Sequence, residues 1–437
     1  MKLWPHQVEA VARLREGNYM LAWEPGVGKT LPALAASAHA AGPSLYLCPA
    51  PLRNQIGAVA RARNPDRPVQ VIQSGHDRLD RGAHLVVCSY EQAADVGRWI
   101  DLITVPWVNL ILDEAHYCKN PTAQRTKAVY GARLNSKGAL YRSAERVWPL
   151  TGTPILNDPT ELWPHVSRLW PDVLDELDIR TADEWMRNFC RVHDTAWGPK
   201  ILGGRNLPVL NRVLKPRMSR LTLAETQQDM PALTTDAINL PPVALDLSGV
   251  DTTAVATLEM ILDQDEDWGA ELGALEPHMA TMRRLWGMAK VPALVDIIKT
   301  ELHGGQQKMV VFFHHTDVGR LLAEGLGQFF PVVIDGSTKD KSWVVKKFAN
   351  GTKHRVLLAQ LVAGGTGLDG MQHATNRVLM AEYAWTPALN QQAIARVARA
   401  GQRLPVRASY CVLANSLDEK IARALSRKEK IVQEVLG

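Results

Sequence analysis

The chain has 437 residues, enough for two or three domains that each bury a core. Apolar residues make up 46% and charged residues 22%, which is ordinary for a globular protein and excludes a largely disordered chain. The net charge of +5 is too small to identify a partner by itself. No apolar run reaches the roughly 20 residues of a membrane span, and the first ten residues lack the apolar core of a signal peptide. The five cysteines form no CxxC pair, so we expect an intracellular protein with no disulfide framework and no zinc site.

Short apolar runs rich in β-branched and aromatic residues recur along the chain. They lie at 45–48, 84–90, 108–114 and 147–152, and again at 309–314, 331–335, 355–360, 376–382 and 408–414. Strands that alternate with helices predict parallel sheets covered by helices, which bind ligands at the carboxyl ends of their strands. We therefore expect an α/β protein with two lobes, 1–235 and 236–437. Helical insertions are expected at about 160–213 in the first lobe and about 250–290 in the second.

Residues 21–30, LAWEPGVGKT, end in the G-K-T of a phosphate-binding loop. Glycines let backbone N–H groups turn toward a phosphate, and the N-terminus of the following helix adds positive potential. We expect Lys29 to bind the β- and γ-phosphates and Thr30 to offer its hydroxyl to Mg²⁺. Trp23 stands where this motif usually has its first glycine, so an ordinary loop is the alternative when this stretch is taken alone.

The stretch LILDEAH at 110–116 is an apolar strand that ends in two carboxylates. Two acids at the end of a buried strand are costly unless they meet a cation. We expect Asp113 to hold Mg²⁺ and Glu114 to orient or deprotonate an attacking water molecule. Two roles stay open for His116, which either couples the site to nucleic acid or forms a local hydrogen bond.

The stretch QQAIARVARAGQ at 391–402 predicts a helix that places Gln392, Arg396 and Arg399 on one stripe. Ile394 and Val397 fall on another face, available for the core. Arginines supplied from the second lobe would act as arginine fingers and tie hydrolysis to closure of the two lobes. A solvated helix face is the alternative.

These motifs, in this order, resemble those of superfamily 2 helicases, and within them the Snf2 group of double-stranded DNA translocases in its compact prokaryotic or viral form. The resemblance covers nearly the whole chain. The matching stretches are LWPHQVEAV at 3–11, WEPGVGKT at 23–30, LYLCPAPLRNQI at 45–56, VVCSYEQ at 86–92, LILDEAHYCKN at 110–120, LTGTPILNDPTELW at 150–163, LKPRMSR at 214–220, VVFFHHTDV at 310–318, DGSTKDKSWVVKKFAN at 335–350, LLAQLVAGGTGLDGM at 357–371 and WTPALNQQAIARVARAGQ at 385–402.

The resemblance implies ATP and Mg²⁺ as cofactors and a role for each matching residue. Gln7 is implied to contact adenine. The phosphate and Mg²⁺ ligands come from one loop and the end of one strand: Glu24, Gly26, Val27, Gly28, Lys29, Thr30 and Asp113. Gly367 and Asp369 are implied to approach the nucleotide from the second lobe, Asp369 standing where the group usually has Asn. Arg396 and Arg399 are the implied arginine fingers, and they join Glu114 and Lys29 as catalytic residues.

The resemblance also implies a DNA track coupled to the nucleotide site by Thr151 and Thr153. Contacts with the phosphate backbone would be salt-dependent and independent of sequence. The candidates for these contacts are Arg53, Asn54, Ser89, Lys119, Ser337, Lys339 and Gln360. For each of them an ordinary solvated surface position is the alternative.

We therefore expect a DNA-dependent ATPase that translocates on double-stranded DNA and uses ATP hydrolysis between two RecA-like lobes to remodel DNA or displace bound protein. Double-stranded DNA is the expected partner, no membrane is expected, and a further protein for targeting stays open. We expect an intracellular protein, cytoplasmic if it is prokaryotic or viral, and we favour a monomer while the oligomeric state stays open. A strand-separating DNA or RNA helicase of superfamily 2, the motor subunit of a restriction system, and a nucleotide-gated DNA-binding clamp with little turnover are the alternatives.

Overall fold

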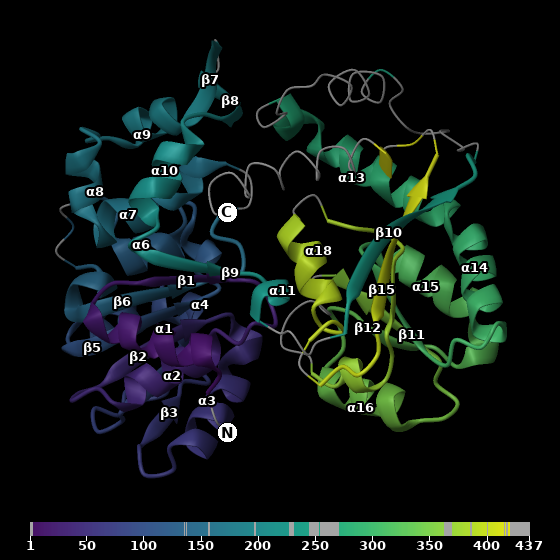
Figure 1. The fold of residues 1–437 in the computed structure, drawn as a ribbon, viewed down its shortest axis with the longest axis horizontal. Helices are drawn as coiled ribbons and strands as arrows, with labels where there is room; N and C mark the ends of the chain where they lie inside the picture. Colours follow the sequence, from purple (N-terminus) through teal and green to yellow (C-terminus); the bar gives the residue numbers. More distant parts are fainter. Residues whose placement is uncertain are drawn as a thin grey trace. The chain divides into compact units, whose positions relative to one another are not determined.

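The computed structural model describes residues 3–134, 136, 138–155, 158–195, 198–226, 231–243, 253, 271–361, 369–384, 387–399, 401–414, 416 and 418–419 (Figure 1). The described residues divide into two compact units. The first comprises residues up to Arg191 together with 204–226, and the second comprises 192–203 and the described residues from 231 on. Each unit contains a sheet of parallel strands covered by helices, which confirms the expected α/β fold with two lobes.

The first unit is built on a seven-stranded sheet in the order β3-β4-β2-β5-β6-β1-β9. All of its paired strands are parallel. The four predicted runs in this part of the chain form β2, β4, β5 and β6, whereas β1, β3 and β9 were not predicted as strands. The strands are β1 (Met20–Trp23), β2 (Ser44–Cys48), β3 (Val69–Val71), β4 (Leu85–Ser89), β5 (Trp107–Asp113), β6 (Ala144–Leu150) and β9 (Met218–Leu221).

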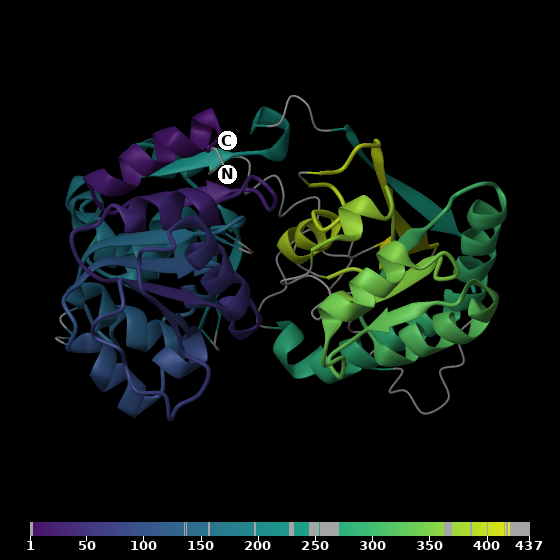
Figure 2. The same cartoon turned by 90° about the horizontal axis from the view of Figure 1, so that it is seen from below.

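Both faces of this sheet are buried, since successive strand side chains alternate between two cores. Leu110 and Leu112 of β5 contribute to one core, and Ile111 contributes to the other. One face is covered by α1 (Pro5–Glu16), α2 (Thr30–Ala38) and α3 (Arg53–Arg63), and α1 and α2 lie side by side in Figures 1 and 2. The opposite face is covered by α4 (Tyr90–Ala93), α5 (Val96–Ile103), α6 (Gln124–Tyr130) and the helices of the following segment.

The segment expected as a helical insertion carries both helices and a hairpin. Its helices are η4 (Pro159–Leu162), α7 (Trp163–Leu169), α8 (Pro171–Glu176), α9 (Ala182–Phe189) and α10 (Leu207–Leu214), and the two-stranded sheet is β7 (Cys190–Thr195) with β8 (Gly198–Gly204). The shorter elements of the unit are η1 (Ala50–Leu52), η2 (Ala115–Cys118), η3 (Leu140–Ser143) and α11 (Leu223–Thr226). Trp163 and Trp185 are buried in the same core as Leu110 and Leu112, so these aromatic rings serve packing.

The second unit has a six-stranded parallel sheet in the order β10-β15-β14-β11-β13-β12. Its strands are β10 (Leu233–Leu240), β11 (Met309–Phe313), β12 (Val332–Ile334), β13 (Val356–Gln360), β14 (Arg377–Met380) and β15 (Val406–Leu413), and the last five of these correspond to the predicted runs. The helices are α13 (Glu271–Ala289), α14 (Val291–His303), α15 (Thr316–Gly325), α16 (Lys341–Asn350) and α18 (Pro387–Ile394), with η5 (Gly327–Phe329) and η6 (Met371–His373). Helices α14 and α15 cover one face, and α13, α16 and α18 cover the other. Of the insertion expected at about 250–290, residues 250–252 and 254–270 lie outside the described residues.

The five cysteines are buried. Within the described ranges, the structure has no helix of the length and apolarity that a membrane crossing requires.

Candidate active site

The turn between β1 and α2 forms the predicted phosphate-binding loop. Gly26 and Gly28 have φ angles of +96° and +88°, in the left-handed region that glycine adopts without strain. A Cβ atom on Gly28 would lie 2.7 Å from Nε2 of Gln7, so a side chain here would have to displace that amide as well as adopt a left-handed backbone conformation. The loop therefore has the local geometry in which backbone N–H groups turn toward an anion.

Lys29 ends this loop, and Thr30 is the first residue of α2. The Lys29 side chain is buried, and its Nζ donates hydrogen bonds to the carbonyl oxygens of Trp23 (2.8 Å) and Glu24 (3.4 Å). These carbonyls hold the ammonium group against the loop that it is predicted to serve.

Trp23, which stands where the phosphate-binding motif usually has its first glycine, packs and hydrogen-bonds within the protein. Its ring is 1% exposed, and its indole N–H donates a 2.7 Å hydrogen bond to Oγ of Ser219 in β9. The ring of His6 meets it edge-on at a centroid distance of 5.2 Å. The tryptophan thereby joins β1 to β9 and α1, and the loop keeps its turn through Gly26 and Gly28 instead.

Gln7, predicted to contact adenine, is buried in a local hydrogen-bond pair. Its Oε1 accepts from the backbone N–H of Trp4 at 3.0 Å, and its Nε2 donates to the carbonyl of Gly28 at 3.2 Å. These bonds tie the start of α1 to the phosphate-binding loop. The adenine contact stays a prediction.

The two carboxylates lie at the end of β5, as predicted. The phenol of Tyr46 in β2 donates a 2.8 Å hydrogen bond to Oδ2 of Asp113, and the Thr30 side chain also hydrogen-bonds that phenol. Burial, followed by the neighbouring Glu114, raises the pKa of Asp113 to about 6. The two predicted metal ligands, Thr30 and Asp113, thus converge on one buried phenol that the sequence analysis missed.

Glu114 adopts a left-handed backbone conformation with φ +51° and ψ +53°, which is uncommon for a residue with a side chain. Its Oε2 is buried without a hydrogen bond and lies 3.4 Å from Nδ1 of His116. Burial, followed by the charge of Lys119, lowers the pKa of His116 to about 4, so the contact joins a carboxylate to a neutral ring at pH 7. A strained residue that carries an unsatisfied buried oxygen is typical of a functional site.

The loop after β6 contains Thr151, Gly152 and Thr153. Oγ1 of Thr151 lies 3.4 Å from Nδ1 of His116 and accepts a 3.1 Å hydrogen bond from the backbone N–H of Thr153. Oγ1 of Thr153 is buried without a hydrogen bond. A Cβ atom on Gly152 would lie 2.9 Å from Cδ of Pro25, so this loop packs directly on the phosphate-binding loop. His116 consequently touches both Glu114 and the threonine loop, which fits either of its open roles.

Arg220 joins the two loops from β9, and the sequence analysis gave it no role of its own. Its Nη1 donates to the carbonyls of Ala22 (2.9 Å) and Gly152 (3.2 Å), and its Nη2 lies 3.4 Å from Oε1 of Glu24. The strand that contains Arg220 pairs with β1 over its whole length. The only sequence signal was its place in the basic segment LKPRMSR.

Most of the predicted DNA contacts in the first unit already bond within the protein. The Arg53 guanidinium donates to the carbonyl of Ile72 (2.7 Å) and to Oε1 of Gln92 (2.7 Å). Ser89 is buried and caps the N-terminus of α4.

Two further candidates of the first unit differ in exposure. Nζ of Lys119 lies 2.6 Å from Oε1 of Glu161. Asn54 is exposed, and its Oδ1 accepts a 2.5 Å hydrogen bond from Nε2 of Gln73. Asn54 thus faces solvent at the carboxyl end of the sheet.

The predicted DNA contacts of the second unit gather where β12 and β13 end. Gln360 is the last residue of β13, and its Oε1 accepts a 3.1 Å hydrogen bond from the N–H of Gly336 in the loop after β12. That loop also carries Ser337 and Lys339, both exposed. The structure therefore brings these three candidates together at one edge of the sheet.

The structure corrects the helical stripe predicted for Gln392, Arg396 and Arg399. Helix α18 ends at Ile394, and the next residues form tighter turns in which the N–H of Arg396 bonds the carbonyl of Ala393. A 3.6-residue period does not hold beyond this point, because the backbone hydrogen bonds there span two, three or four residues. Gln392 is buried, whereas both arginines are half-buried.

Arg399 is placed beside a second predicted nucleotide residue. Its Nη1 lies 3.4 Å from Oδ1 of Asp369. Ile394 and Val397 belong to the core, as predicted. Gly367 lies outside the described residues.

The residues of the first unit fit a nucleotide and a divalent cation. Asp113 is a buried carboxylate whose raised pKa shows that its charge lacks sufficient compensation, which a cation would supply. Buried oxygens of Glu114 and Thr153 are without hydrogen bonds in the described part of the chain. Together with the glycine loop and Lys29, these features define a protein of the nucleotide-hydrolysing α/β class, with its site at the carboxyl ends of β1, β5 and β6.

Comparison with known proteins agrees with this class. Residues 6–248 match the model of the SNF2-related domain, and residues 289–401 match the helicase conserved C-terminal domain. The chain belongs to the SNF2-related family, whose members are helicase-like ATPases.

Two relatives illustrate the similarity. The chain is 27% identical over 464 residues to the mouse (Mus musculus) DNA annealing helicase and endonuclease ZRANB3, covering 100% of this chain and 41% of that protein. It is 28% identical over 443 residues to the SWI/SNF-related matrix-associated actin-dependent regulator of chromatin subfamily A-like protein 1 of Xenopus tropicalis, covering 98% and 44%. The chain thus spans less than half the length of these two relatives.

Among solved structures, the Sulfolobus solfataricus SWI2/SNF2 ATPase core in complex with dsDNA aligns with a TM-score of 0.45 and 20% identity, covering 100% of this chain and 93% of that chain.

Proposed function

We propose that this protein is an ATPase that depends on DNA, translocates along double-stranded DNA, and so remodels DNA or displaces bound protein. The observation that carries the proposal is Glu114, whose buried oxygen is held without a hydrogen bond beside a neutral histidine. Family membership and the names of the relatives, which describe a DNA annealing helicase and a chromatin regulator, support DNA as the substrate of the motion.

The chain's own residues divide the chemistry among them. Gly26 and Gly28 shape the loop for the phosphates, and Lys29 supplies a positive charge to them. Asp113 and Thr30 would hold Mg²⁺, which neutralises charge on the phosphates when it is bound. Glu114 would orient and deprotonate the attacking water, since its free oxygen needs a donor.

The arginines Arg396 and Arg399 of the second unit remain the proposed arginine fingers. A guanidinium that reaches the γ-phosphoryl group contributes about 10³- to 10⁵-fold to the rate in related chemistry. Asp369, which lies 3.4 Å from Arg399, would hold that side chain until nucleotide competes for it. Thr151 and Thr153 would transmit the state of the nucleotide, because His116 contacts both Glu114 and Thr151.

The proposed DNA contacts follow from exposure. Lys339, Ser337 and Asn54 are exposed and would touch phosphates directly. Arg53 would hold the segment that carries Asn54, since its guanidinium donates to the carbonyl of Ile72. Gln360 would hold the loop that carries Ser337 and Lys339, since its Oε1 accepts from the N–H of Gly336. Binding to such contacts would weaken steeply with salt.

The experiment is steady-state ATP hydrolysis by the full chain alone and with duplex DNA, single-stranded DNA or RNA. We expect strong stimulation by blunt duplex DNA and no turnover by Lys29→Ala. Glu114→Gln should lower kcat by about 10²- to 10⁴-fold and still bind nucleotide, because it removes the base and keeps the shape. The matched control is Glu9→Gln on the exposed face of α1.

Each of the other outcomes would indicate a different function for this protein. Stimulation only by single strands or RNA would replace the duplex translocase with the strand-separating helicase. Full DNA binding without turnover under any condition would indicate the nucleotide-gated clamp. Unchanged turnover in Glu114→Gln would remove Glu114 from the mechanism.

A further inference from the structure

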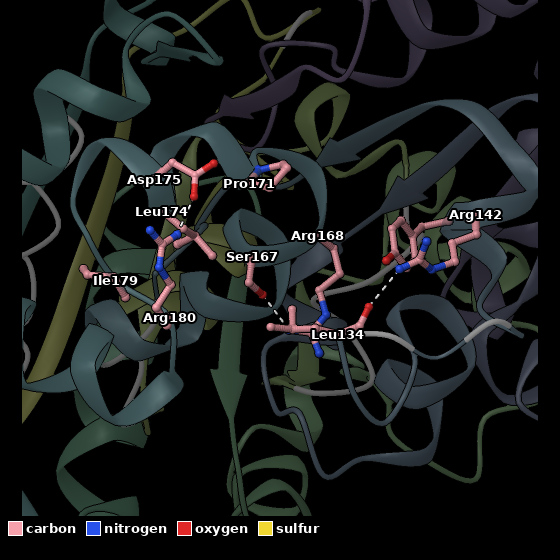
Figure 3. Close-up of a pocket in the computed structure, with 10 residues that line it drawn as sticks. Leu134, Arg142, Ser167, Arg168, Pro171, Leu174, Asp175, Ile179 and Arg180 are labelled. Atoms are coloured by element: carbon pink, nitrogen blue, oxygen red, sulfur yellow. Dashed lines mark hydrogen bonds and ion pairs between the residues drawn. The ribbon is translucent and has the colours of Figure 1, made fainter.

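A pocket of about 400 Å³ lies in the first unit, formed by η3, α7 and α8 (Figure 3). Its walls carry three arginines, one carboxylate and several apolar side chains: Leu134, Tyr141, Arg142, Ser167, Arg168, Pro171, Leu174, Asp175, Ile179 and Arg180. The volume lies within the range of small-ligand sites, about 300–1,000 Å³.

Two of the arginines face neutral partners only. Arg168 donates from Nε to the carbonyl of Tyr130 (3.4 Å) and from Nη1 to Oγ of Ser167, and burial lowers the pKa of its guanidinium. Arg142 donates from Nη2 to the carbonyl of Leu134 (2.8 Å), and its guanidinium lies 5.1 Å from the centre of the Tyr141 ring. Neither forms an ion pair with any residue that the structure describes.

The third arginine is neutralised. Arg180 pairs with Asp175 and also lies 3.5 Å from Asp178. Figure 3 shows this pair on one side of Arg168 and Arg142 on the other. The lining therefore has a net charge of +2, which Arg142 and Arg168 carry. The Arg168 side chain is half-buried.

The pocket is separate from the proposed nucleotide site. Helix η3, which carries Arg142, comes directly before β6, and the Thr151 loop comes directly after it. The seven residues of β6 span roughly 20 Å at about 3.3 Å per residue. The pocket thus lies at the amino end of this strand, whereas the candidate nucleotide and DNA contacts lie at the carboxyl ends.

We propose that this pocket binds a small phosphate monoester with an apolar body. A phosphate monoester carries a charge of about −1.5 to −2 at pH 7, which matches the net charge of the lining, and its three acceptor oxygens suit guanidinium donors. The apolar body packs on Leu174, Pro171 and Ile179, which form the uncharged wall.

The test is calorimetric titration of the full chain with phenyl phosphate, which combines the two features in a molecule that is not a nucleotide. We expect saturable binding that is tighter than that of inorganic phosphate or phenol. Arg168→Gln and Arg142→Gln should each weaken it about tenfold or more, since each removes a charge-assisted hydrogen bond. Asp175→Asn should strengthen binding severalfold, because it removes the negative charge of the lining and leaves Arg180 with only its 3.5 Å contact to Asp178.

Two controls separate the pocket from other sites. Arg13→Gln removes the same charge from the exposed face of α1 and should leave the affinity unchanged. Lys29→Ala should also leave it unchanged, because Lys29 belongs to the nucleotide loop. Near-UV circular dichroism shows whether each variant is folded. If Arg168→Gln does not fold, the loss of affinity in Arg142→Gln tests the proposal by itself.

Absence of saturable binding would overturn the proposal. Loss of binding in Lys29→Ala with full binding in both arginine variants would place the probe in the nucleotide loop and overturn it as well. If inorganic phosphate binds as tightly as phenyl phosphate, the apolar body contributes no affinity and that part of the proposal is wrong. None of these results bears on ATP hydrolysis, so they leave the proposed function untouched.

Discussion

Arg220 offers a direct test of how the site of the first unit is held together. It reaches from β9 to the carbonyl of Ala22 at 2.9 Å, to the carbonyl of Gly152 at 3.2 Å and to Oε1 of Glu24 at 3.4 Å. Replacement by Gln would remove the charge and most of these contacts, and would leave two carbonyls and a carboxylate without their donor.

The expected cost follows from these contacts. A hydrogen bond to a charged group contributes about 1.5–3 kcal/mol, and two are lost. Burial lowers the pKa of Arg220, and this effect is larger than the opposing effect of the Glu24 charge. Removing a guanidinium that is costly to bury therefore offsets part of the stability lost with its hydrogen bonds. We expect a net decrease of about 2–4 kcal/mol in the free energy of unfolding of the first unit. Arg220→Lys should lose less, because it keeps the charge, although it lacks the planar fork that reaches the two carbonyls with Nη1 and Glu24 with Nη2.

Two measurements check this expectation. Urea unfolding gives the free energy, and hydrogen exchange of the peptides covering 21–30 and 150–155 shows whether both loops loosen together. The matched control is Arg212→Gln on α10, whose side chain is 70% exposed and 3.8 Å from Glu176, and which should change stability by less than about 0.5 kcal/mol. If Arg220→Gln behaves like this control and protection of both loops is unchanged, the proposed connection through Arg220 is refuted.

Three further perturbations test other parts of the same unit. Trp23→Phe should lower the unfolding free energy by about 1–3 kcal/mol, since it leaves the Ser219 hydroxyl without its 2.7 Å donor, and Ser219→Ala in the same background should recover part of that loss in urea unfolding. Gly28→Ala should weaken nucleotide binding in a fluorescence titration, because a left-handed φ of +88° costs about 1–2 kcal/mol and the new methyl group displaces Gln7; wild-type affinity would contradict this. Burial lowers the pKa of His165 to about 4, so the unfolded chain takes up the proton first and stability falls as pH decreases from 6.5 to 4, by about 1.4 kcal/mol per pH unit. His165→Gln should reduce that slope by one proton in urea unfolding at pH 7 and pH 5, and an unchanged slope would show that this histidine is not the group that titrates.

The sequence predicted the parts of the fold that depend on long apolar runs. Strand β5 is seven residues long and buried throughout, and it ends in Asp113, so both the strand and the carboxylate at its end followed from the pattern alone. Strand β1 was missed because it has only four residues and is buried on both faces, so it shows no alternation. The helix after Pro387 was predicted too long, because its change to tighter turns beyond Ile394 leaves no mark in the apolar spacing.

The candidate site was predicted where its residues belong to short motifs, and missed where they come from distant segments. Lys29 and Thr30 are neighbours in the sequence. Tyr46 reaches Asp113 only because β2 pairs with β5, and Arg220 is 198 residues from Ala22, which it bonds through the pairing of β9 with β1. Neither pairing is encoded in local composition, since strand order is a property of the folded sheet.

The protonation state of His116 connects these features to the proposed chemistry. A histidine with an ordinary pKa beside a carboxylate would gain a proton near neutral pH, pair with Glu114 and occupy the oxygen that is proposed to accept a proton from water. Burial and Lys119 lower the pKa of His116 to about 4, so at neutral pH the ring contacts both Glu114 and Thr151 without adding a charge. Lys119 is itself held by Glu161 at 2.6 Å, which fixes one source of that positive potential. The arrangement therefore leaves Glu114 without a cationic partner on His116 and connects it through that ring to the threonine loop, as the proposed coupling of hydrolysis to movement on DNA requires.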